Sequence, residues 1–295
     1  MCENLKGNIF YHKIMQKILV ILTLIALASL LPINLGASAF VADKPMQRVF
    51  NDASLNWAGY YVKGTGIGVA NATWTVPTVV NTVSGYSSAW VGIGGVNGNG
   101  LIQTGTEQDC STSAATAGEV KFHGPVIEDK SASGSHNGGG GGSTTCTPVY
   151  YAWWETYPAN AEQKITMTIL PGDQMNAQLI QTAPGVWIIS IVDMTHFQTF
   201  STTVTFSPDQ TTAESIVERP SLCSTHSCKL TNLADFQTIN FEKSVSGTTT
   251  TSQVAFDADP THTIINMVDS SLRLMAQPGT LSSPGTFPTT WIRSS

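Results

Sequence analysis

Short runs of β-favouring residues follow one another along most of this chain, and they constrain its fold more than any other feature. From Ser54 onward, Val, Thr, Ile, Tyr and Trp recur in short runs that Gly, Asn and Pro separate. No window shows the sustained apolar period of a long amphipathic helix. The sequence therefore predicts an all-β protein.

The positions of these runs predict individual strands. We expect strands over 68–79, 87–96, 185–195, 197–206, 238–247 and 262–268, and a strand, a Pro-Gly turn and a second strand over 164–180. The runs at 185–195 and 197–206 are predicted to form a hairpin. Many short strands with regular turn signals are typical of a β-sandwich or a barrel, here as a single domain.

The N-terminus has the pattern of a targeting segment. Two lysines precede an apolar run at 18–31, and Ala37-Ser38-Ala39 offers the small residues that a signal peptidase reads. A membrane anchor is the alternative, but the run is shorter than the roughly 20 residues that a spanning helix needs. We therefore predict cleavage after Ala39 and a secreted protein.

The rest of the chain divides into three regions. We expect residues 40–53 to form a short pro-segment or an N-terminal arm, and residues 54–295 to form the β-sandwich domain. A Gly-rich tract at 131–144 is predicted to be a surface loop of that domain. Its glycines lack the spacing of a phosphate-binding loop.

The low charge of the chain bears on its partners and its working pH. Only 12% of the residues are charged and the formal net charge is −6, so nothing suggests a nucleic-acid partner. Fully protonated, the chain would carry at most about +20, from 14 Lys and Arg and 6 His. Self-repulsion in acid would therefore be mild, which permits work at low pH.

The cysteines predict two disulfides. The first cysteine leaves with the signal segment, and an even number, four, remains in an exported chain. Cys223 and Cys228 flank only four residues, so a local pair is the simplest choice and leaves Cys110 for Cys146. The sequence alone does not select among the three possible pairings. A zinc site with His226 is the alternative, although its spacing fits no common zinc pattern.

The usual hydrolase signatures are missing. There is no HExxH, no GxSxG and no pair of Asp-Thr/Ser-Gly motifs. The histidines lie in loop or turn contexts, away from a motif Ser or Cys: His123, His136, His196, His226 and His262. The remaining candidates are polar residues within apolar strands.

Three such residues stand out. Gln103 follows two aliphatic residues, Glu155 lies in the aromatic run "YYAWWETYP", and Glu218 ends the run "TTAESIVE". Strand alternation places Glu218 and Glu214 on the same face. Glu214 is expected to have a supporting role at most, or ordinary solvent exposure.

Six motifs occur along the chain in an order that a known family shares. They are "NWAGYYV" at 56–62, "TWTVPTV" at 73–79, "SAWVGIGG" at 88–95, "LIQTGTE" at 101–107, "YAWWETYP" at 151–158 and "AESIVERP" at 213–220. With these motifs the chain resembles the glutamic peptidases, also called eqolisins. The resemblance implies a sandwich of two curved antiparallel sheets, of the concanavalin or jelly-roll type, which binds a polypeptide in a concave face and cleaves it in acid.

The resemblance also implies roles for individual residues. Gln103 and Glu218 fall on the catalytic positions, and Trp90 and Glu155 fall in or near the substrate cleft. Three further residues of the matched motifs are predicted to bind substrate: Trp57, Trp153 and Glu107. No metal or cofactor is expected.

The chain departs from the family pattern at three positions. Gly94 and Tyr151 stand where members often carry Asp, and Glu107 replaces another Asp. The first change removes a carboxylate near the catalytic pair. Because of this change, the resemblance does not specify the pH optimum.

A Gln and a Glu are sufficient for peptide hydrolysis in acid. A histidine base would already be protonated there, whereas a carboxylate with a reference pKa of about 4.3 can still be ionised. Glu218 would take a proton from water and return it to the leaving nitrogen. Gln103 would hold the water through its carbonyl and donate its amide to the oxyanion.

Two other functions remain open at this point. A secreted β-sandwich rich in tryptophan could bind carbohydrate on Trp90, Trp153 and Trp154, or could be a cell-surface domain without catalysis. For the peptidase we expect a monomer that acts on polypeptides and has no stable membrane association after signal cleavage.

Overall fold

Buried and less buried side chains alternate along the strands of this protein, as its sequence predicts. In β10 (Val186–Asp193), every second side chain is buried, from Trp187 to Asp193. β10 pairs with β11 (Gln198–Thr205) in antiparallel register from Val186 opposite Thr205 to Asp193 opposite Gln198. The hairpin predicted over 185–206 is therefore present.

The computed structural model describes residues 53–80, 82, 84–97, 99–111, 120–124, 145–224 and 227–295. The predicted signal peptide, the Gly-rich tract 131–144 and His226 lie outside these residues, so their assignments stay predictions. Within the described part, no helix is long and apolar enough to cross a membrane. The described residues belong to one compact unit.

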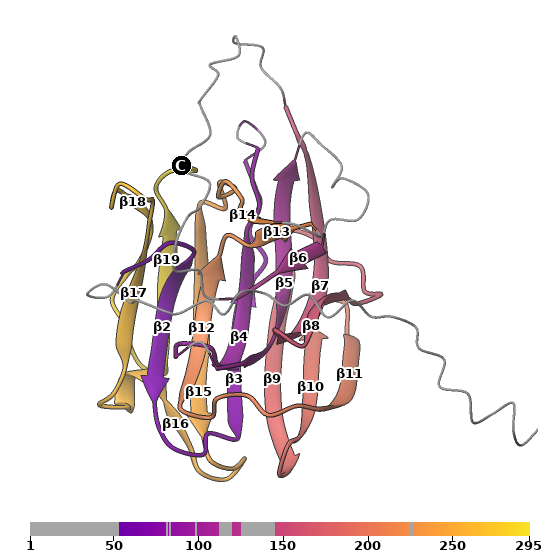
Figure 1. Cartoon of the computed structure of the whole chain (residues 1–295), viewed down its shortest axis with the longest axis vertical. Coiled ribbons are helices and arrows are strands. Elements are labelled where there is room, and N and C mark those ends of the chain that lie inside the picture. Colours follow the sequence, from indigo (N-terminus) through magenta and orange to yellow (C-terminus); the bar gives the residue numbers. More distant parts are fainter. Residues whose placement is uncertain are drawn as a thin grey trace, which may run out of the picture. The chain divides into compact units, whose positions relative to one another are not determined.

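The strands form two facing layers that share one hydrogen-bonded path (Figure 1). The first layer has, in spatial order, β11, β10, β9 (Gln174–Ala183), β3 (Val69–Thr75), β15 (Thr238–Gly247), β19 (Phe287–Trp291), β18 (Leu274–Pro278) and β17 (Thr263–Val268). The path continues from β17 into the second layer, with β2 (Trp57–Lys63), β12 (Thr212–Glu218), β4 (Ser88–Gly94), β5 (Leu101–Ser111), β7 (Thr147–Tyr157) and β8 (Asn160–Lys164). This is the β-sandwich that the sequence predicts.

Several short elements lie off this path. They are β1 (Ala53–Ser54), which pairs in parallel with β17, β16 (Gln253–Ala255), which pairs with β15, and the 3-10 turn η2 (Phe256–Ala258). A separate small sheet has the order β14 (Cys228–Leu230), β13 (Ser221–Cys223) and β6 (Val120–Phe122). Figure 1 shows this small sheet in front of the upper part of the second layer.

The main core lies between the two layers. It is rich in large side chains on the first layer, such as Trp74, Trp187 and Phe241, and in small ones on the second, such as Ala89 and Ala213. Burying this much apolar surface is the dominant stabilising term of such a sandwich.

The second layer is buried on both of its faces. All residues of β4 and β12 are buried, which a sheet with one solvated face would not allow. A second cluster on the outer face explains this burial. It contains Trp57, Tyr61, Trp90, Leu101, Phe122, Tyr151, Trp153, Tyr157 and Ile216, with smaller neighbours. Phe122 belongs to β6, so the small sheet helps to cover the layer.

One predicted strand is wrong. Of residues 164–170, only Lys164 lies in a strand, at the end of β8. Ile165 donates its N–H to Ala152 O, and the chain then leaves the ladder. Ile165 and Ile169 are both buried in the main core, so their apolar spacing reflects anchoring of an irregular segment.

The four cysteines of the domain form two disulfides. Cys223 is joined to Cys228, and Cys110 is joined to Cys146. This is the pairing that the close spacing of Cys223 and Cys228 favours.

Candidate active site

The register of five strands brings the predicted site residues onto the outer face of the second layer. Directly paired residues point to the same side of a sheet. Glu218 on β12 lies opposite Trp57 and Ser88, and Ser88 lies opposite Glu107 on β5. Gln103 lies opposite Glu155 on β7. This face thus carries all seven residues: Trp57, Trp90, Gln103, Glu107, Trp153, Glu155 and Glu218.

The carboxylate of Glu218 is fully buried and accepts three N–H groups. Asn56 Nδ2 donates to Oε1 at 2.7 Å, and Trp90 Nε1 donates to Oε2 at 2.9 Å. The backbone N–H of Gly124 donates to Oε1 at 3.2 Å. Burial raises the pKa of Glu218 to about 8, although His123 and the N–H donors favour the charged form. In this closed arrangement Glu218 is therefore neutral in acid.

The side chain of Gln103 is also fully buried, and its two ends differ. Its Nε2 donates to the carbonyl oxygen of His123 and, at 2.7 Å, to Glu155 Oε2. Its Oε1 has no hydrogen-bond partner among the described residues. The NH₂ group of the Gln103 amide thus donates to a peptide carbonyl, whereas the amide oxygen can still accept a hydrogen bond.

A segment that the sequence did not point to covers this face. We call Lys121–Gly124 the covering segment; it comprises the end of β6 and the two residues after it. Asn56 Nδ2 donates to Gly124 O at 2.7 Å, and His123 N donates to Glu155 Oε2 at 3.0 Å. The backbone of the covering segment therefore contacts both Gln103 and Glu218.

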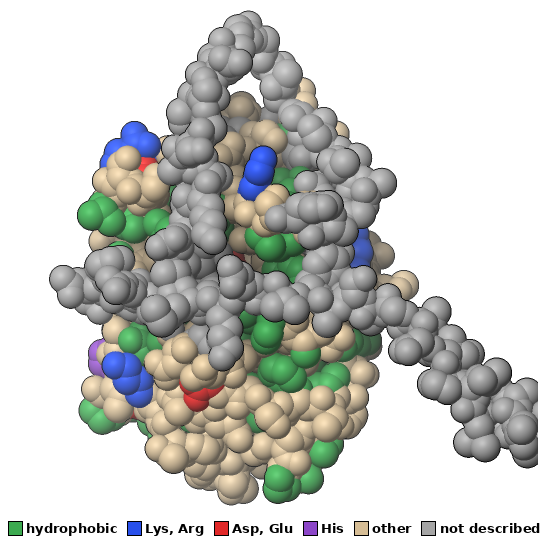
Figure 2. All heavy atoms as spheres, viewed as in Figure 1, with side chains coloured by type: hydrophobic (Ala, Val, Ile, Leu, Met, Phe, Trp, Pro, Cys, Tyr) green, Lys and Arg blue, Asp and Glu red, His purple; other side chains and the backbone are tan. Residues whose placement is uncertain are grey.

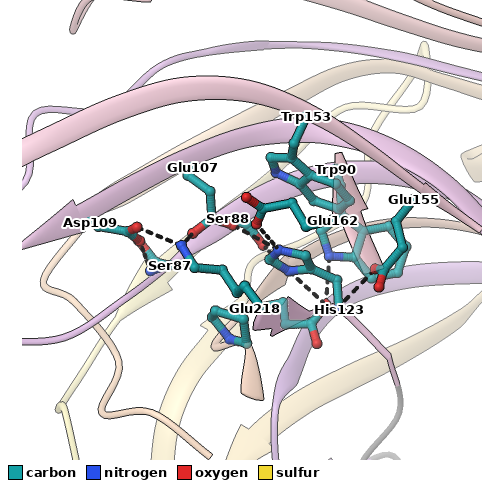
Figure 3. Close-up of polar contacts among 12 residues, drawn as sticks. Ser87, Ser88, Trp90, Glu107, Asp109, His123, Trp153, Glu155, Glu162 and Glu218 are labelled. Atoms are coloured by element: carbon teal, nitrogen blue, oxygen red, sulfur yellow. Dashed lines mark hydrogen bonds and ion pairs between the residues drawn. The ribbon is translucent and has the colours of Figure 1, made fainter. Parts of the chain in front are cut away.

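His123 is fully buried on the face, where its ring lies among the side chains of Glu107, Glu162 and Glu218 (Figure 3). Its ring stacks on Trp153 with 4.0 Å between the centroids and an angle of 12°. Its Nε2 lies 2.9 Å from Glu162 Oε2 and 3.1 Å from Glu107 Oε1, and its Nδ1 lies 3.8 Å from Glu218 Oε2. Burial disfavours its charge, but these carboxylates raise the pKa of His123 well above its usual range. His123 is a cation here.

Lys121 forms a second anchor of the covering segment. Its Nζ contacts Glu107 Oε2 at 2.8 Å and Asp109 Oδ2 at 2.7 Å, and donates to Tyr151 OH at 2.7 Å. Burial works against the charge of Glu107, yet Lys121 and His123 lower its pKa to about 2. Burial and the neighbouring Glu107 raise the pKa of Asp109. The Lys121 ammonium group thus contacts two carboxyl groups that differ in charge. Glu107 is ionised, whereas Asp109 keeps its proton to a higher pH than usual.

The three departures from the family pattern have structural explanations. Gly94 has φ +93°, and a Cβ there would lie 2.4 Å from Gly100 O and 2.6 Å from Asp209 O, so no Asp fits. Tyr151 and Glu107 are both partners of Lys121. Two of the departures therefore accompany the covering segment.

One expectation about exposure is corrected. Glu214 is fully buried, and neither carboxylate oxygen has a hydrogen-bond partner among the described residues. The solvent exposure that we considered for it is wrong, because every residue of β12 is buried. His123 lies outside any strand, directly after β6, as its loop context in the sequence indicates, and it is fully buried.

The tryptophans do not form a platform for sugar. Trp153 belongs to the cluster on the outer face, whereas Trp154 packs against the main core on the opposite face. Trp90 and Trp153 are fully buried. A stacking surface for a carbohydrate needs exposed rings on one side, so this arrangement does not favour a lectin.

Sequence reasoning missed four residues that line the site. These are Asn56, Lys121, His123 and Glu162. Asn56 begins the matched motif "NWAGYYV", which could have pointed to it. The alternation of "VKFHG" at 120–124 predicts a short strand but not its location over the sheet.

Two groups of described side chains come close enough together to share a metal ion: Glu107, His123 and Glu162, and Asp173, Asp193 and His196. In the first group Lys121 Nζ already contacts Glu107. The Lys121 ammonium group would repel a metal ion there. In the second, backbone N–H groups of Thr195 and His196 donate to Asp193, which accounts for the carboxylate without a metal.

Comparisons with known proteins agree with this fold. The sequence profile of the Peptidase A4 family matches residues 55–124 and 135–283, well over half of the chain. Scytalido-glutamic peptidase, solved with a transition state analog inhibitor, has a TM-score of 0.61 and 20% identity, covering 80% of this chain and 98% of its own. SCP-B, a member of the Eqolisin family solved with the tripeptide Ala-Ile-His, has a TM-score of 0.57 and 19% identity at the same coverage.

Aspergilloglutamic peptidase from Aspergillus niger is similar over less of this chain. Its TM-score is 0.50 and its identity 21%, covering 70% of this chain and 99% of its own. At these identities the structural likeness concerns the fold. No curated protein sequence matches the chain.

Proposed function

Because the chain belongs to the Peptidase A4 family, we propose that it is a secreted acid endopeptidase in which Glu218 and Gln103 are the catalytic pair. The family membership supports peptide hydrolysis in general. The roles of the two residues, the acidic working range and the secretion are the parts of this proposal that go further.

One observation carries the assignment of the pair. Gln103 Nε2 donates to the carbonyl of a peptide unit, and Glu218 Oε1 accepts from the N–H of the same unit, between His123 and Gly124. Peptide hydrolysis needs a donor at the carbonyl oxygen and a proton carrier at the leaving nitrogen. The two side chains stand at these two positions.

The chemistry of the step follows from these contacts. The unpartnered Gln103 Oε1 can accept a hydrogen bond from the attacking water. Glu218, once ionised, takes a proton from that water and passes it to the nitrogen, while the Gln103 amide stabilises the oxyanion. Burial keeps Glu218 neutral in the closed arrangement. When water enters the cleft, the pKa of Glu218 falls toward the ordinary range. The carboxylate is then ionised in mild acid.

The proposal is tested by incubating the purified protein with a denatured protein substrate between about pH 2 and 6. We expect peptide products in acid, and we expect activity to persist with pepstatin, with metal chelators and with reagents for serine or thiol groups. Pepstatin mimics a transition state held by two Asp carboxylates, and this site offers one carboxylate and one amide. Loss of activity with a chelator would contradict the metal-free mechanism.

Secretion is proposed on the N-terminal pattern and the two disulfides, which persist in oxidising compartments. We expect the mature chain to begin near Phe40 and to contain no free thiol. N-terminal sequencing of the exported protein and thiol titration under denaturing conditions check both points. A mature protein that retains the apolar run 18–31 would contradict the prediction.

A further inference from the structure

We propose that the peptide bond between His123 and Gly124 is itself a substrate of Gln103 and Glu218, so that the protein cuts its own covering segment once. This inference rests on the proposed function, because it uses the same catalytic pair. It adds a specific bond, a self-processing activity and a modified form of the chain.

The contacts around this bond are those of a bound substrate. The carbonyl oxygen of His123 accepts from Gln103 Nε2, and the N–H of Gly124 lies 3.2 Å from Glu218 Oε1. The flanking backbone groups are bound as well, because His123 N donates to Glu155 and Gly124 O accepts from Asn56. All four polar atoms of this stretch of backbone therefore have side-chain partners, three on strands of the second layer and one, Asn56, just before β2.

The side chain before the bond fills a pocket of matching chemistry. The imidazole ring of His123 lies flat on Trp153, and its nitrogens face Glu162, Glu107 and Ser88. A protein that binds its own loop in a pocket of opposite charge holds that loop in one register. The register found here places the bond after His123 between the two catalytic side chains.

The residue after the bond allows the close approach. A Cβ on Gly124 would lie 2.9 to 3.0 Å from three ring carbons of Tyr157. Glycine at this position lets the backbone descend onto the face of the sheet. The lack of a side chain also keeps the nitrogen of the bond within reach of Glu218.

The proposed step is a hydrolysis and needs only water. The oxygen of water bonds to the carbonyl carbon of His123 and the bond from that carbon to Gly124 N breaks. Glu218, which is neutral in the closed arrangement, gives its proton to the nitrogen, which leaves as the new amino group of Gly124, and takes one proton from the water in return. His123 acquires the new carboxyl group.

The consequence is an enzyme that first occupies its own cleft. The face that carries Gln103 and Glu218 is buried while the covering segment is intact, so an external polypeptide cannot reach the pair. Cutting the segment releases two new ends from the site. The cut lies between Cys110 and Cys146, so the disulfide keeps the two pieces in one molecule.

The experiment follows the intact chain after a shift from pH 7 to the acidic pH at which external substrate is cleaved. Wild type and Glu218→Gln are sampled over time, with and without reduction, by intact mass and N-terminal sequencing. We expect wild type to gain the mass of one water without reduction. After reduction it should give two fragments, the second beginning Gly124-Pro125-Val126. Glu218→Gln should stay intact, also when a trace of wild type is added, because the step is intramolecular.

Each other outcome is decisive. Cleavage of external substrate by a chain whose 123–124 bond stays whole overturns the self-processing and leaves the proposed function standing. A first cut at another bond, or cutting of Glu218→Gln by added wild type, also overturns it. A chain that cleaves neither its own bond nor external substrate overturns the proposed function as well. Thermal unfolding of both proteins, measured beforehand, ensures that a folded molecule is compared.

Discussion

At the scale of single residues, Glu218 is held by opposing influences. Burial raises its pKa to about 8, while the N–H groups of Asn56 and Trp90 stabilise its charge. A carboxyl group with such a balance can lose or gain a proton when its access to water changes. This property suits a group that must first accept a proton and then release it.

The catalytic pair gives the first prediction. Glu218→Gln is nearly isosteric but cannot accept a proton, so activity should fall to background. Gln103→Ala removes the oxyanion donor and should lower kcat by about 10²–10³. Gln103→Glu places a second carboxylate in the site, so the two groups should share a proton and the pH optimum should move. Activity on a denatured protein across pH 2 to 6 measures all three.

A surface variant controls for this comparison. Glu242→Gln, on an exposed position of β15 in the other layer, should keep wild-type activity. All variants must also unfold at the wild-type temperature, so that lost activity is not lost structure. A folded Glu218→Gln that cleaves at near wild-type rates would show that the base is another residue.

Sequence patterns located some of these residues and not others. Gln103 and Glu218 each lie in a strand motif whose local alternation sets the face of the side chain. Lys121, His123 and Glu162 act through contacts that join distant parts of the chain. Their side chains follow no local period that marks a site. Only the folded arrangement reveals them.

At the scale of elements, ion pairs hold the covering segment on the second layer more than strand pairing does. β6 pairs with β13 over three residues, which is a short ladder. Lys121 adds contacts with Glu107 and Asp109, and it is 10% exposed. Removing one partner of a buried ion pair typically costs about 3–5 kcal/mol. Lys121 should therefore contribute much of the free energy that keeps the covering segment on the second layer.

Lys121→Met gives the second prediction. In the Glu218→Gln background, which keeps the segment intact, we expect the amide hydrogens of Phe122 and His123 to exchange on the order of 10² faster at pH 5 to 6. Glu107 has its pKa lowered to about 2 in the folded protein, against about 4.3 when unfolded. Its contribution is thus present above pH 4.3 and is lost as the pH falls to 2. The two proteins should converge near pH 2.

Lys164→Met serves as the matched control. Lys164 lies over the ring of Tyr151, with Nζ 3.7 Å from its centroid, but forms no ion pair among the described residues. Its removal should leave exchange in the covering segment unchanged. Equal effects of the two lysine variants would mean that charge near Tyr151, and not the Lys121 contacts, governs closure.

Strand prediction succeeded where the pattern was local. The hairpin of β10 and β11 and the strand β15 appear where alternation predicts them. The stretch 165–170 was misassigned because its apolar residues anchor an irregular segment in the core. The position of β6 over the sheet could not be predicted, since a strand of three residues carries too little pattern to specify a partner.

At the scale of the whole molecule, few charges lie on the surface. Figure 2 shows the described part of one face as mostly uncharged, with scattered Lys, Arg, Asp and Glu side chains. With only 12% charged residues, acid adds little self-repulsion. The acids that matter for stability are instead buried in the second layer.

Three of these buried acids give the last prediction. Burial raises the pKa of Glu155, Glu214 and Glu218 above the ordinary range. In the unfolded chain they ionise near pH 4.3, whereas in the folded protein they stay neutral to higher pH, about 8 for Glu218. The unfolded state therefore binds fewer protons between these values. Their contribution is fully present below pH 4.3 and is lost as the pH rises.

Glu214 is the best probe of this effect, because neither of its oxygens has a hydrogen-bond partner among the described residues. Each such group makes the free energy of unfolding fall by up to about 1.4 kcal/mol per pH unit above its unfolded pKa. Glu214→Gln removes one group, so its stability should fall less steeply than that of wild type. Denaturant unfolding at several pH values from 4 to 8 measures both slopes. The comparison uses the Glu218→Gln background to prevent proteolysis, and Glu242→Gln, which should keep the parental slope, as the control. Parallel curves for Glu214→Gln and its parent would mean that Glu214 is ionised in the folded protein and that water reaches its carboxylate.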